Sequence, residues 1–371
     1  MLCCIFNYPP HYREAIYRLM DEELHPHFYF GDRVAGGQIQ EMDCTKLEGY
    51  RGRFRCVTYK RKILWMSKIL GLLFRREYTC YILSNDSACL SEWLFLYLAR
   101  LMGKPTYLWT HGWYGNESRW ARFRNLAFYR PVSGLLLYGN RARRLLVEQG
   151  VAERKLHVIA NSLDYDHQLA LRSAIRPTNV YHSLFGNDRP TLLFIGRLTA
   201  VKKLDMLLRS VGRLRDLGHD VNVAIVGSGP EEALLEQQVA ELGLTACVRL
   251  LGACYDERLN AQYIHDADLC VSPGNVGLTA IHSLTYGTPV VTHNNFSLQM
   301  PEFEAISAGQ TGAFFVEGSV ESLTDTIAEW LAKHPRKDRA TIEACYKTID
   351  EVYNPHRQLA VLKQVLNRQE L

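Results

Sequence analysis

Disulfide and metal-binding patterns are missing from the sequence, although it contains ten cysteines. No two cysteines form a CxxC pair, and no cysteine or histidine spacing is of the kind that binds zinc. Several cysteines lie inside apolar runs typical of β-strands, where a thiol behaves as a small apolar side chain. We therefore expect buried thiols, no metal site, and the reducing environment of the cytoplasm.

Long hydrophobic runs are missing as well. A helix that crosses a bilayer needs ~20 apolar residues, and the best candidate, from Ile63 to Phe74, is much shorter and is interrupted by Lys68. The opening MLCCIFNYPPHYREAIY has no basic segment before its short apolar run, which is unlike a secretory signal. We expect a chain that begins at Met1 and does not span a membrane.

Several common functional patterns do not occur: a Walker-type phosphate loop, the surroundings of a catalytic serine, and an aromatic-rich basic module for nucleic acid. Another pattern is incomplete. VGSGP places Gly227 and Gly229 after an apolar run, but the third glycine of a dinucleotide fingerprint is replaced by Glu232. An NAD(P)-dependent enzyme is therefore a weak alternative, and we expect no nucleic-acid partner.

The net charge of +4 hides an asymmetry between the two halves of the chain. Residues 1–165 contain 24 basic and 15 acidic residues, a net charge of +9, and the remainder contains 19 basic and 24 acidic residues, a net charge of −5. Basic residues flank the run from Ile63 to Phe74, whose apolar residues recur at helical spacing and include Trp65. This composition suits a helix on an anionic membrane, or equally a domain helix with its apolar side in the core.

Apolar β-type runs alternate with helical segments, which predicts parallel sheets built from βαβ units. Residues 1–165 contain seven such runs, from LCCIFNY to LHVIAN and including RFRCVTY at 53–59, and form one α/β domain. Residues 166–188 lose these runs and end in GNDRP, which is typical of a connection between domains. A second doubly wound α/β domain begins at residue 189. Ligands of such sheets bind beyond the carboxyl ends of the strands.

Strand ends of the second domain suit a diphosphate. Gly196 and Arg197 end the run TLLFIGR, and Lys202 enters the next helix. An arginine fork and a lysine ammonium can neutralise phosphate oxygens in several directions. In SPGNVGLTAIHSL, Gly277 stands where a helix should begin, so amides at the same sheet edge would face an anion. The alternatives are a solvated basic surface and glycines that only allow tight packing.

Five ordered blocks in the last half of the chain resemble the C-terminal domain of the family 4 retaining glycosyltransferases, which have the GT-B fold. They are FIGRLTAVKKLDMLL, VAIVGSGP, LLGA, ADLCVSPGNVGLTAIHSLTYGTPVV and MPEFEAISAGQTGAFF. The first half is similar in outline only. The resemblance implies two Rossmann-like domains facing across a cleft. It assigns acceptor binding to 1–165, nucleotide-sugar binding to 189–345, and a helix that crosses back to the first domain to 346–371.

The resemblance also implies a donor site without a metal or other cofactor, in which the UDP- or GDP-linked sugar is a co-substrate. Arg197 and Lys202 match the basic pair that neutralises the donor diphosphate, and His111, at the end of TYLWTH, matches a histidine near the donor sugar. These three are the predicted catalytic residues. The predicted donor-binding residues are Gly196, Gly227, Gly229, Asn275, Gly277, Leu278, Thr279, His282 and Glu302, and the predicted acceptor-side residues are Pro10, His11, Tyr12 and Trp113.

Two glutamates that the family places in this region are absent. Counting back from Gly287, their positions hold Gly274 and His282. His282 can hydrogen-bond a ribose hydroxyl or pack against a neighbouring helix, whereas Gly274 offers only backbone. Glu302 and Glu304, in a later loop, could replace a carboxylate or be solvated.

Residues of the first domain also have structural explanations. His111 could be a hydrogen-bonded core histidine as readily as a ligand of the sugar. The aromatic residues Trp109, Trp113, Tyr114 and Trp120 could stack on a sugar or fill the interior.

These features predict a cytoplasmic, peripheral membrane hexosyltransferase that elongates a lipid-linked or surface polysaccharide precursor. Its predicted partners are the nucleotide-sugar donor, a glycan or lipid-linked acceptor, and an anionic membrane surface. The alternative is a catalytically silent GT-B protein that binds a nucleotide or glycan as a partner subunit, and the two missing glutamates support it.

Overall fold

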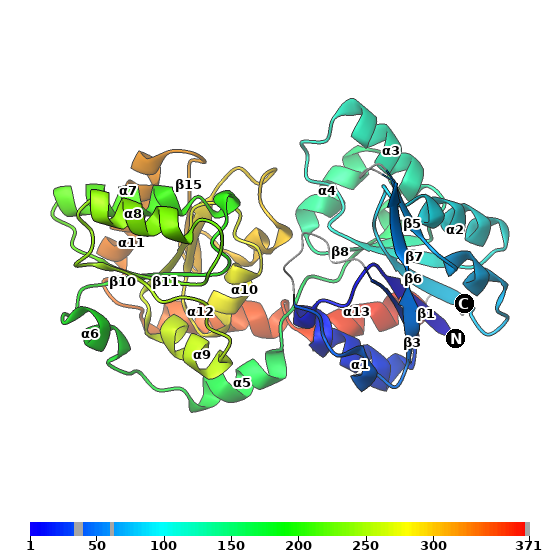
Figure 1. Cartoon of the computed structure of the whole chain (residues 1–371), viewed down its shortest axis with the longest axis horizontal. Coiled ribbons are helices and arrows are strands. Elements are labelled where there is room, and N and C mark those ends of the chain that lie inside the picture. Colours follow the sequence, from blue (N-terminus) through cyan, green and yellow to red (C-terminus); the bar gives the residue numbers. More distant parts are fainter. Residues whose placement is uncertain (33–39, 60–62, 368–371) are drawn as a thin grey trace. The chain divides into compact units, whose positions relative to one another are not determined.

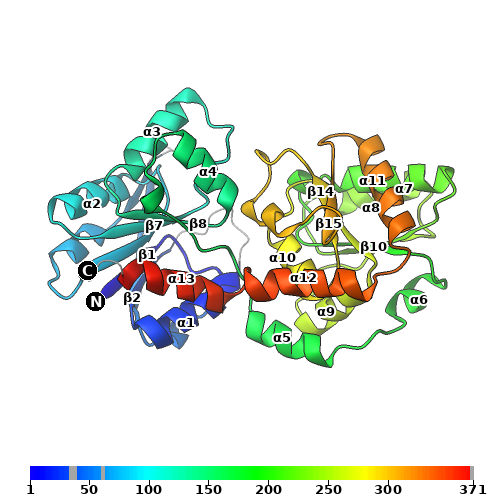
Figure 2. The same ribbon diagram turned by 180° about the vertical axis from the view of Figure 1, so that it is seen from behind.

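The computed structural model describes residues 1–32, 40–59 and 63–367 (Figures 1 and 2). The chain forms two compact units, one of Met1–Asp164 with Asn354–Leu371 and the other of Tyr165–Tyr353, called unit 1 and unit 2 here. None of the helices in the described ranges combines the length and apolar character needed to cross a membrane.

Unit 1 is built on a parallel seven-stranded sheet with the order β3-β2-β1-β6-β7-β8-β9. Its central strands are buried along their whole length, as expected for strands covered on both faces. Alternate residues of one strand enter different cores: Cys3 and Ile5 face one, Cys4 and Phe6 the other. The strands are β1 (Leu2–Phe6), β2 (His27–Gly31), β3 (Tyr50–Phe54), β6 (Cys80–Ser84), β7 (Thr106–Thr110), β8 (Gly134–Leu137) and β9 (Leu156–Val158).

Helices cover both faces of this sheet. On one face, α13 (Pro355–Asn367) lies beside α1 (Glu14–Leu24), as Figure 2 shows, and Leu359 and Leu362 share a core with Tyr17. The other core receives residues of α2 (Leu90–Leu101), α3 (Arg119–Tyr129) and α4 (Asn140–Glu148). Short 3-10 helices complete the unit: η1 (His11–Arg13), η2 (Cys44–Lys46), η3 (Ile69–Phe74) and η4 (Glu153–Lys155).

The prediction of an amphipathic helix between Ile63 and Phe74 is wrong. β4 (Cys56–Tyr59) pairs antiparallel with β5 (Ile63–Met66), and η3 follows. Leu64 and Met66 are buried while Trp65 between them is 40% exposed, which is the period-two pattern of a strand. Lys68 then adopts a left-handed backbone conformation (φ 67°) that a continuing helix would not allow. The basic residues at 60–62 lie outside the described residues.

Unit 2 contains a parallel six-stranded sheet with the order β12-β11-β10-β13-β14-β15. The chain moves outward from β10 to β12 and then returns to the other side of β10 with β13, so the strand order reverses between β10 and β13. Ligands of open α/β sheets bind beyond the carboxyl ends of the strands at such a point. The strands are β10 (Thr191–Ile195), β11 (Asn222–Val226), β12 (Val248–Leu250), β13 (Leu269–Ser272), β14 (Val290–His293) and β15 (Gly312–Phe315).

Helices flank the sheet of unit 2 as well. Its core joins Leu207, Leu208 and Val211 to strand residues such as Phe194 and Ile225. The helices are α5 (Tyr165–Ala174), α6 (Val180–Phe185), α7 (Leu204–Asp216), α8 (Glu232–Glu241), α9 (Glu257–Asp266), α10 (Leu278–Thr285), α11 (Val320–Lys333) and α12 (Arg339–Glu351), with the 3-10 helices η5 (Ala200–Lys202) and η6 (Pro301–Ala305).

The segment at 166–188 is part of unit 2 and not a separate connection. It forms α5 and α6, and Tyr181 of α6 is buried with its hydroxyl donating to the Tyr263 carbonyl (2.6 Å). The prediction that the segment crossing back to the first domain begins at residue 346 is also wrong, because the change of unit occurs later in the chain. α12 belongs to unit 2, and the change to unit 1 occurs at Asn354, directly before α13.

Candidate functional site

The loops after β10 and β11 of unit 2 touch each other through their backbones. A Cβ on Gly227 would lie 1.8 Å from the Gly196 carbonyl oxygen, and one on Gly229 would lie 2.2 Å from the Leu198 carbonyl oxygen. Neither position can hold a side chain without moving the backbone. The predicted residues Gly196, Gly227 and Gly229 are therefore neighbours at the carboxyl edge of the sheet, and tight packing alone accounts for the two later glycines.

Lys202 holds the loop after β13. Its Nζ donates to the backbone and side-chain oxygens of Asn275 (2.6 and 3.0 Å), and its carbonyl accepts from the Gly274 amide (2.9 Å). Burial lowers the pKa of Lys202 to about 8; Arg197 acts in the same direction and Glu302 opposes it. Lys202 thus carries a charge at neutral pH that it gives up more easily than an exposed lysine.

Arg197, directly after β10, differs from Lys202 in its surroundings. Its side chain is exposed, and it makes no ion pair with any described residue. A guanidinium at the carboxyl edge of a sheet, unpaired within the part of the chain that the structure describes, is available for a ligand. Arg197 and Lys202 influence each other electrostatically, so the predicted basic pair is brought together.

α10 begins at the same edge. Gly277 precedes it, and Thr279 Oγ1 in its first turn donates to the carbonyl of Ile195 at the end of β10 (2.9 Å). The amides at the start of a helix carry partial positive charge and lack intrahelical partners. The predicted residues Asn275, Gly277, Leu278 and Thr279 therefore lie beside Gly196 and close to Lys202, where they can bind an anion.

Glu302 places a carboxylate near this cation. It lies in η6, is buried, and its charge raises the pKa of Lys202 against the effect of burial. Glu304, two residues later, is only half-buried. Of the two candidates to replace a missing carboxylate, Glu302 is the one whose charge acts on Lys202.

His282 contacts a carboxylate that the sequence did not indicate. Its Nε2 lies 3.0 Å from Glu257 Oε1, which also accepts hydrogen bonds from the Tyr286 hydroxyl (2.7 Å) and Gln168 Nε2 (2.9 Å). Burial raises the pKa of Glu257, but His282 and these donors outweigh it and hold the pKa at about 2. Glu257 opens α9, after the N-cap Asp256, and no motif marks it as functional.

The acceptor-side predictions of unit 1 are placed differently from one another. Pro10 forms an isolated bridge with Glu41, and the exposed His11 contacts the Gln40 carbonyl through Nδ1 (3.2 Å). Tyr12 is half-buried. Trp113, in contrast, is 4% exposed and lies in a hydrophobic core, so its ring is not available for stacking on a sugar.

His111 follows β7 directly and is surrounded by aromatic rings. Its ring centroid is 4.9 Å from that of Tyr138 and 6.2 Å from that of Tyr114. Burial, with the charge of Arg13, lowers the pKa of His111 to about 4. The imidazole is therefore neutral at physiological pH and can donate or accept one hydrogen bond without adding a charge. Arg13 is a second residue that the sequence did not indicate.

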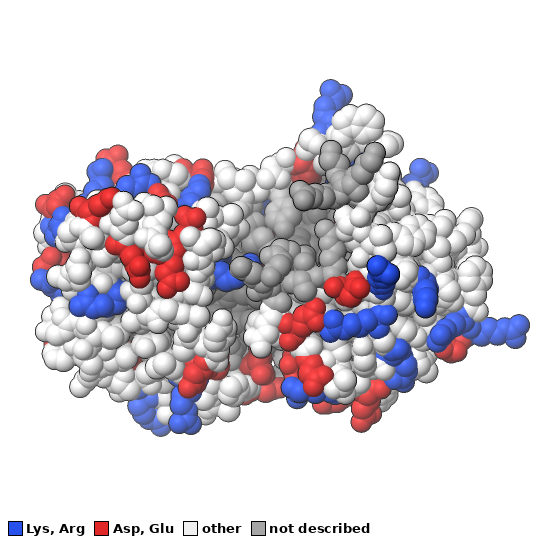
Figure 3. Space-filling model, in the orientation of Figure 1, with Lys and Arg blue, Asp and Glu red and all other residues white. Residues whose placement is uncertain are grey.

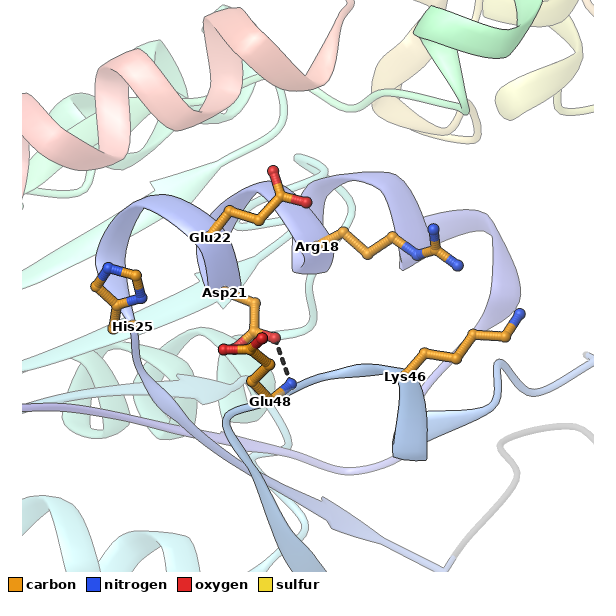
Figure 4. A pocket seen from close by; sticks show the side chains of 6 residues that line it. All are labelled: Arg18, Asp21, Glu22, His25, Lys46 and Glu48. Atoms are coloured by element: carbon orange, nitrogen blue, oxygen red, sulfur yellow. Dashed lines mark hydrogen bonds between the residues drawn. The ribbon is translucent and has the colours of Figure 1, made fainter.

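A pocket elsewhere in unit 1 contains none of the predicted residues. It lies between α1 and the segment after η2, where the Asp21 carboxylate accepts from the Glu48 and Gly49 amides (2.6 and 2.9 Å) (Figure 4). Its lining mixes both signs of charge, and Asp21 has a structural role in it. The lining residues are Arg18, Asp21, Glu22, His25, Lys46 and Glu48.

Comparison with known proteins finds a matching family model and relatives for most of unit 2. Residues 176–348 match the family model for glycosyl transferases group 1. The 2-deoxystreptamine glucosyltransferase of Streptomyces kanamyceticus is 27% identical over 168 residues, which are 44% of this chain and 43% of the relative. A GDP-mannose-dependent alpha-(1-6)-phosphatidylinositol monomannoside mannosyltransferase of Mycolicibacterium smegmatis is 28% identical over 163 residues, 41% of each chain. The chain thus spans about two fifths of the length of these curated relatives.

Solved structures resemble the whole chain. The lipopolysaccharide outer core galactosyltransferase WaaB has a TM-score of 0.73 at 14% identity, with full coverage of both chains. Anabaena HepE in complex with UDP has a TM-score of 0.71, also at 14% identity and with full coverage of both chains. These likenesses show the fold, and the GT-B prediction with its two parallel α/β units is confirmed.

Proposed function

We propose that this chain, whose residues 176–348 match the family model for glycosyl transferases group 1, moves a hexose from a nucleoside diphosphate to a glycan or lipid-linked acceptor with retention of configuration. The observation that carries the proposal is the arrangement of Arg197, Lys202 and the start of α10 at one sheet edge of that domain. Relatives with UDP in their structures and with GDP-mannose in their names make UDP and GDP the two nucleotides to test.

The donor diphosphate would lie between Arg197 and the first turn of α10. The free guanidinium can bind two phosphate oxygens side by side, and the helix amides can bind others. Lys202 keeps the loop from Gly274 to Gly277 in place and adds charge. When the sugar leaves, negative charge grows on the diphosphate, and preformed donors stabilise it best. We propose that these groups do so without a divalent metal.

The ribose would be bound beside His282. Because Glu257 contacts Nε2 of that ring, a ribose at this place would meet a carboxylate as well as an imidazole. A carboxylate is a strong acceptor for a sugar hydroxyl. We propose that Glu257, supplied by α9, takes over the acceptor role that position 282 itself cannot fill.

We propose that the membrane is bound by α2 and α3 and not by the segment 63–74. Tyr97 of α2 donates to the Ala127 carbonyl (3.1 Å), so the two helices are neighbours (Figure 1). Their exposed apolar side chains form what we call the α2–α3 apolar surface: Leu90, Leu94, Tyr97, Leu101, Trp120 and Phe123.

The basic residues of α3 also favour membrane binding by the α2–α3 apolar surface. The exposed arginines Arg119, Arg122 and Arg124 alternate with Trp120 and Phe123 along α3. Both signs of charge are mixed over the face shown in Figure 3, so the excess positive charge is not gathered there. Aromatic and basic residues together bind the interface of an anionic membrane. A peripheral enzyme acting on lipid-linked precursors of surface polysaccharide would need such a surface.

The decisive experiment measures nucleotide binding and product. Thermal unfolding is followed with UDP, GDP and ADP in EDTA, and the anomeric configuration of the transferred sugar is read by NMR. We expect UDP or GDP to raise the melting temperature without added metal, and the product to keep the configuration of the donor. Binding that requires Mg²⁺ or Mn²⁺ would contradict metal independence, and binding without donor turnover would support the silent alternative.

A further inference from the structure

A cation in unit 1 lies among aromatic rings. Arg13 ends η1, and its guanidinium carbon lies 5.3 Å from the ring centroid of Trp109 and 5.8 Å from that of Tyr138. Its terminal nitrogens donate to the hydroxyls of Tyr17 (3.3 Å) and Tyr138. Within the described ranges no carboxylate pairs with Arg13. Rings and hydroxyls orient this charge but do not neutralise it.

Two hydrogen-bond donors of this cluster are also unused. Arg13 Nε and Trp109 Nε1 are both buried and have no hydrogen-bond partner among the described residues. Trp109 is 3% exposed, so its N–H is shielded from bulk water in this structure. Buried donors are nearly always paired in folded proteins, so two unpaired donors in one cluster need an explanation, and a bound acceptor would supply it.

The cluster lies where a parallel sheet binds ligands. Arg13 comes from the segment after β1, Trp109 lies near the end of β7, His111 follows β7, and Tyr138 follows β8. The carboxyl ends of parallel strands share one edge of the sheet. The rings of His111 and Tyr138 are 4.9 Å apart, and Tyr138 also contacts Arg13, which links the histidine to the cation.

We propose that Arg13, Trp109 and His111 form a subsite for an oxyanion, a phosphate or carboxylate carried by the acceptor. That the ligand is the acceptor rests on the proposed function, whereas the anion site itself follows from unit 1 alone. An oxyanion would neutralise Arg13 and accept hydrogen bonds from both unused donors. A neutral sugar hydroxyl would leave the charge of Arg13 unpaired. The acceptor class is therefore an acidic or phosphorylated glycan.

Histidine ring signals in two-dimensional NMR give a local test of this site. The full-length protein is saturated with UDP, so that the phosphate site of unit 2 is occupied, and the His111 signal is identified by its loss in His111→Gln. Glucose 1-phosphate, glucuronate and glucose are then added separately. We expect the phosphate or the carboxylate to move the His111 signal and glucose to leave it unchanged. The arm that binds more tightly tells a phosphorylated acceptor from an acidic one.

Variants decide whether Arg13 is responsible. Arg13→Gln should weaken anion binding at least tenfold, and Arg13→Lys, which keeps the charge but loses Nε, should weaken it less. Arg18→Gln removes an exposed charge from α1 and is the matched control, with unchanged binding. Equal binding by Arg13→Gln and the parent would overturn the proposal. If Arg13→Gln does not fold, equal binding by Arg13→Lys and Trp109→Phe would overturn it.

The same samples separate this proposal from the proposed function. If UDP binds normally and His111 responds to glucose as it does to the anions, the oxyanion subsite is wrong and the donor site stands. If UDP does not bind the parent protein but the anions still move the His111 signal in an Arg13-dependent manner, the proposed function is overturned and the subsite stands.

Discussion

His282 and Glu257 form a close pair, with 3.0 Å between Nε2 of the imidazole and Oε1 of the carboxylate. The two residues come from neighbouring helices, α10 and α9. The expected contact of His282 with a neighbouring helix therefore exists, and it is made to an acid. A carboxylate enters the region where the family pattern would place one, but from a different segment of the chain.

Because of this pair, the free energy of unfolding should fall at acidic pH. The pKa of Glu257 is held at about 2, below the ordinary 4.5, so the carboxylate stabilises the folded state fully above pH 4.5 and loses that effect as the pH falls towards 2. Glu257→Gln should cost about 2 kcal/mol of unfolding free energy at pH 7. Urea unfolding at pH 7 and pH 3 measures both values.

The difference between Glu257→Gln and the parent should shrink at pH 3. Glu329→Gln, on the exposed surface of α11, is the control and should match the parent at both pH values. A loss for Glu257→Gln that is as large at pH 3 as at pH 7 would show that the charge has no part in it.

The same pair should affect donor binding. His282→Ala removes the ring, and Glu257→Gln removes the charge but keeps its shape. If the two residues bind the ribose, each variant should raise the donor KM more than it lowers kcat, because that contact is equal in the ground and transition states. Steady-state kinetics with a UDP-sugar checks this. An unchanged KM in both variants, with folding intact, would assign the pair a structural role only.

The sequence predicted the strands well because buried parallel strands leave a strong local signal. The runs around β1, β7, β10 and β13 are mostly apolar and end in glycine, proline or polar residues. The run from Ile63 to Phe74 misled because its apolar residues fit the helical period as well as the alternation of a strand, and pairing with β4 decided between them.

The site was only partly predictable, for a different reason. Arg197, Lys202 and Gly277 lie within ordered blocks, so position along the chain was enough to find them. Glu257 and Arg13 acquire their importance from contacts with distant residues, His282 in one case and Trp109 in the other. Such contacts depend on how helices and strands pack and have no local pattern.

Nucleotide binding should weaken at alkaline pH because of Lys202. Because its pKa is about 8, Lys202 loses its proton as the pH rises through that value, and a diphosphate then binds more weakly. Above pH 8 the affinity for UDP should fall by up to roughly tenfold per pH unit. Calorimetric titration between pH 7 and pH 9.5 measures this. Lys202→Met should bind UDP weakly throughout, and a persistent fall in that variant would point to another group.

Membrane binding should depend on the α2–α3 apolar surface. Trp120→Ser with Phe123→Ser removes two exposed aromatic rings from α3, which are 81% and 69% exposed, and should greatly reduce flotation with vesicles of anionic lipid. Tyr255→Ser in unit 2 removes a ring that is 87% exposed and is the control. Flotation of the double variant equal to that of the parent and the control would exclude this surface.

Restoring the missing glutamate at position 274 should fail. A Cβ there would lie 1.9 Å from the Val201 carbonyl oxygen and 2.7 Å from the Cα of Lys202, so any side chain must push η5 away from the loop after β13. We expect Gly274→Glu to lose roughly 1–3 kcal/mol of stability, the usual cost of overpacking. UDP affinity should fall with it, because the shift separates Lys202 from Asn275.

Two alanine variants separate the backbone clash from the effect of the new charge. Gly274→Ala makes the same clash without a carboxylate, and Gly212→Ala, in α7 with open space around it, should be neutral or stabilise by about 0.5–1 kcal/mol. Thermal unfolding and UDP titration are measured on all three proteins. If Gly274→Glu is as stable as the parent and turns over donor faster, the close approach of η5 is not a constraint and the carboxylate is missing for another reason. If Gly274→Ala and Gly274→Glu lose stability and UDP affinity equally, the glycine is required by its neighbour's backbone, and the carboxylate of this site has to come from elsewhere in unit 2.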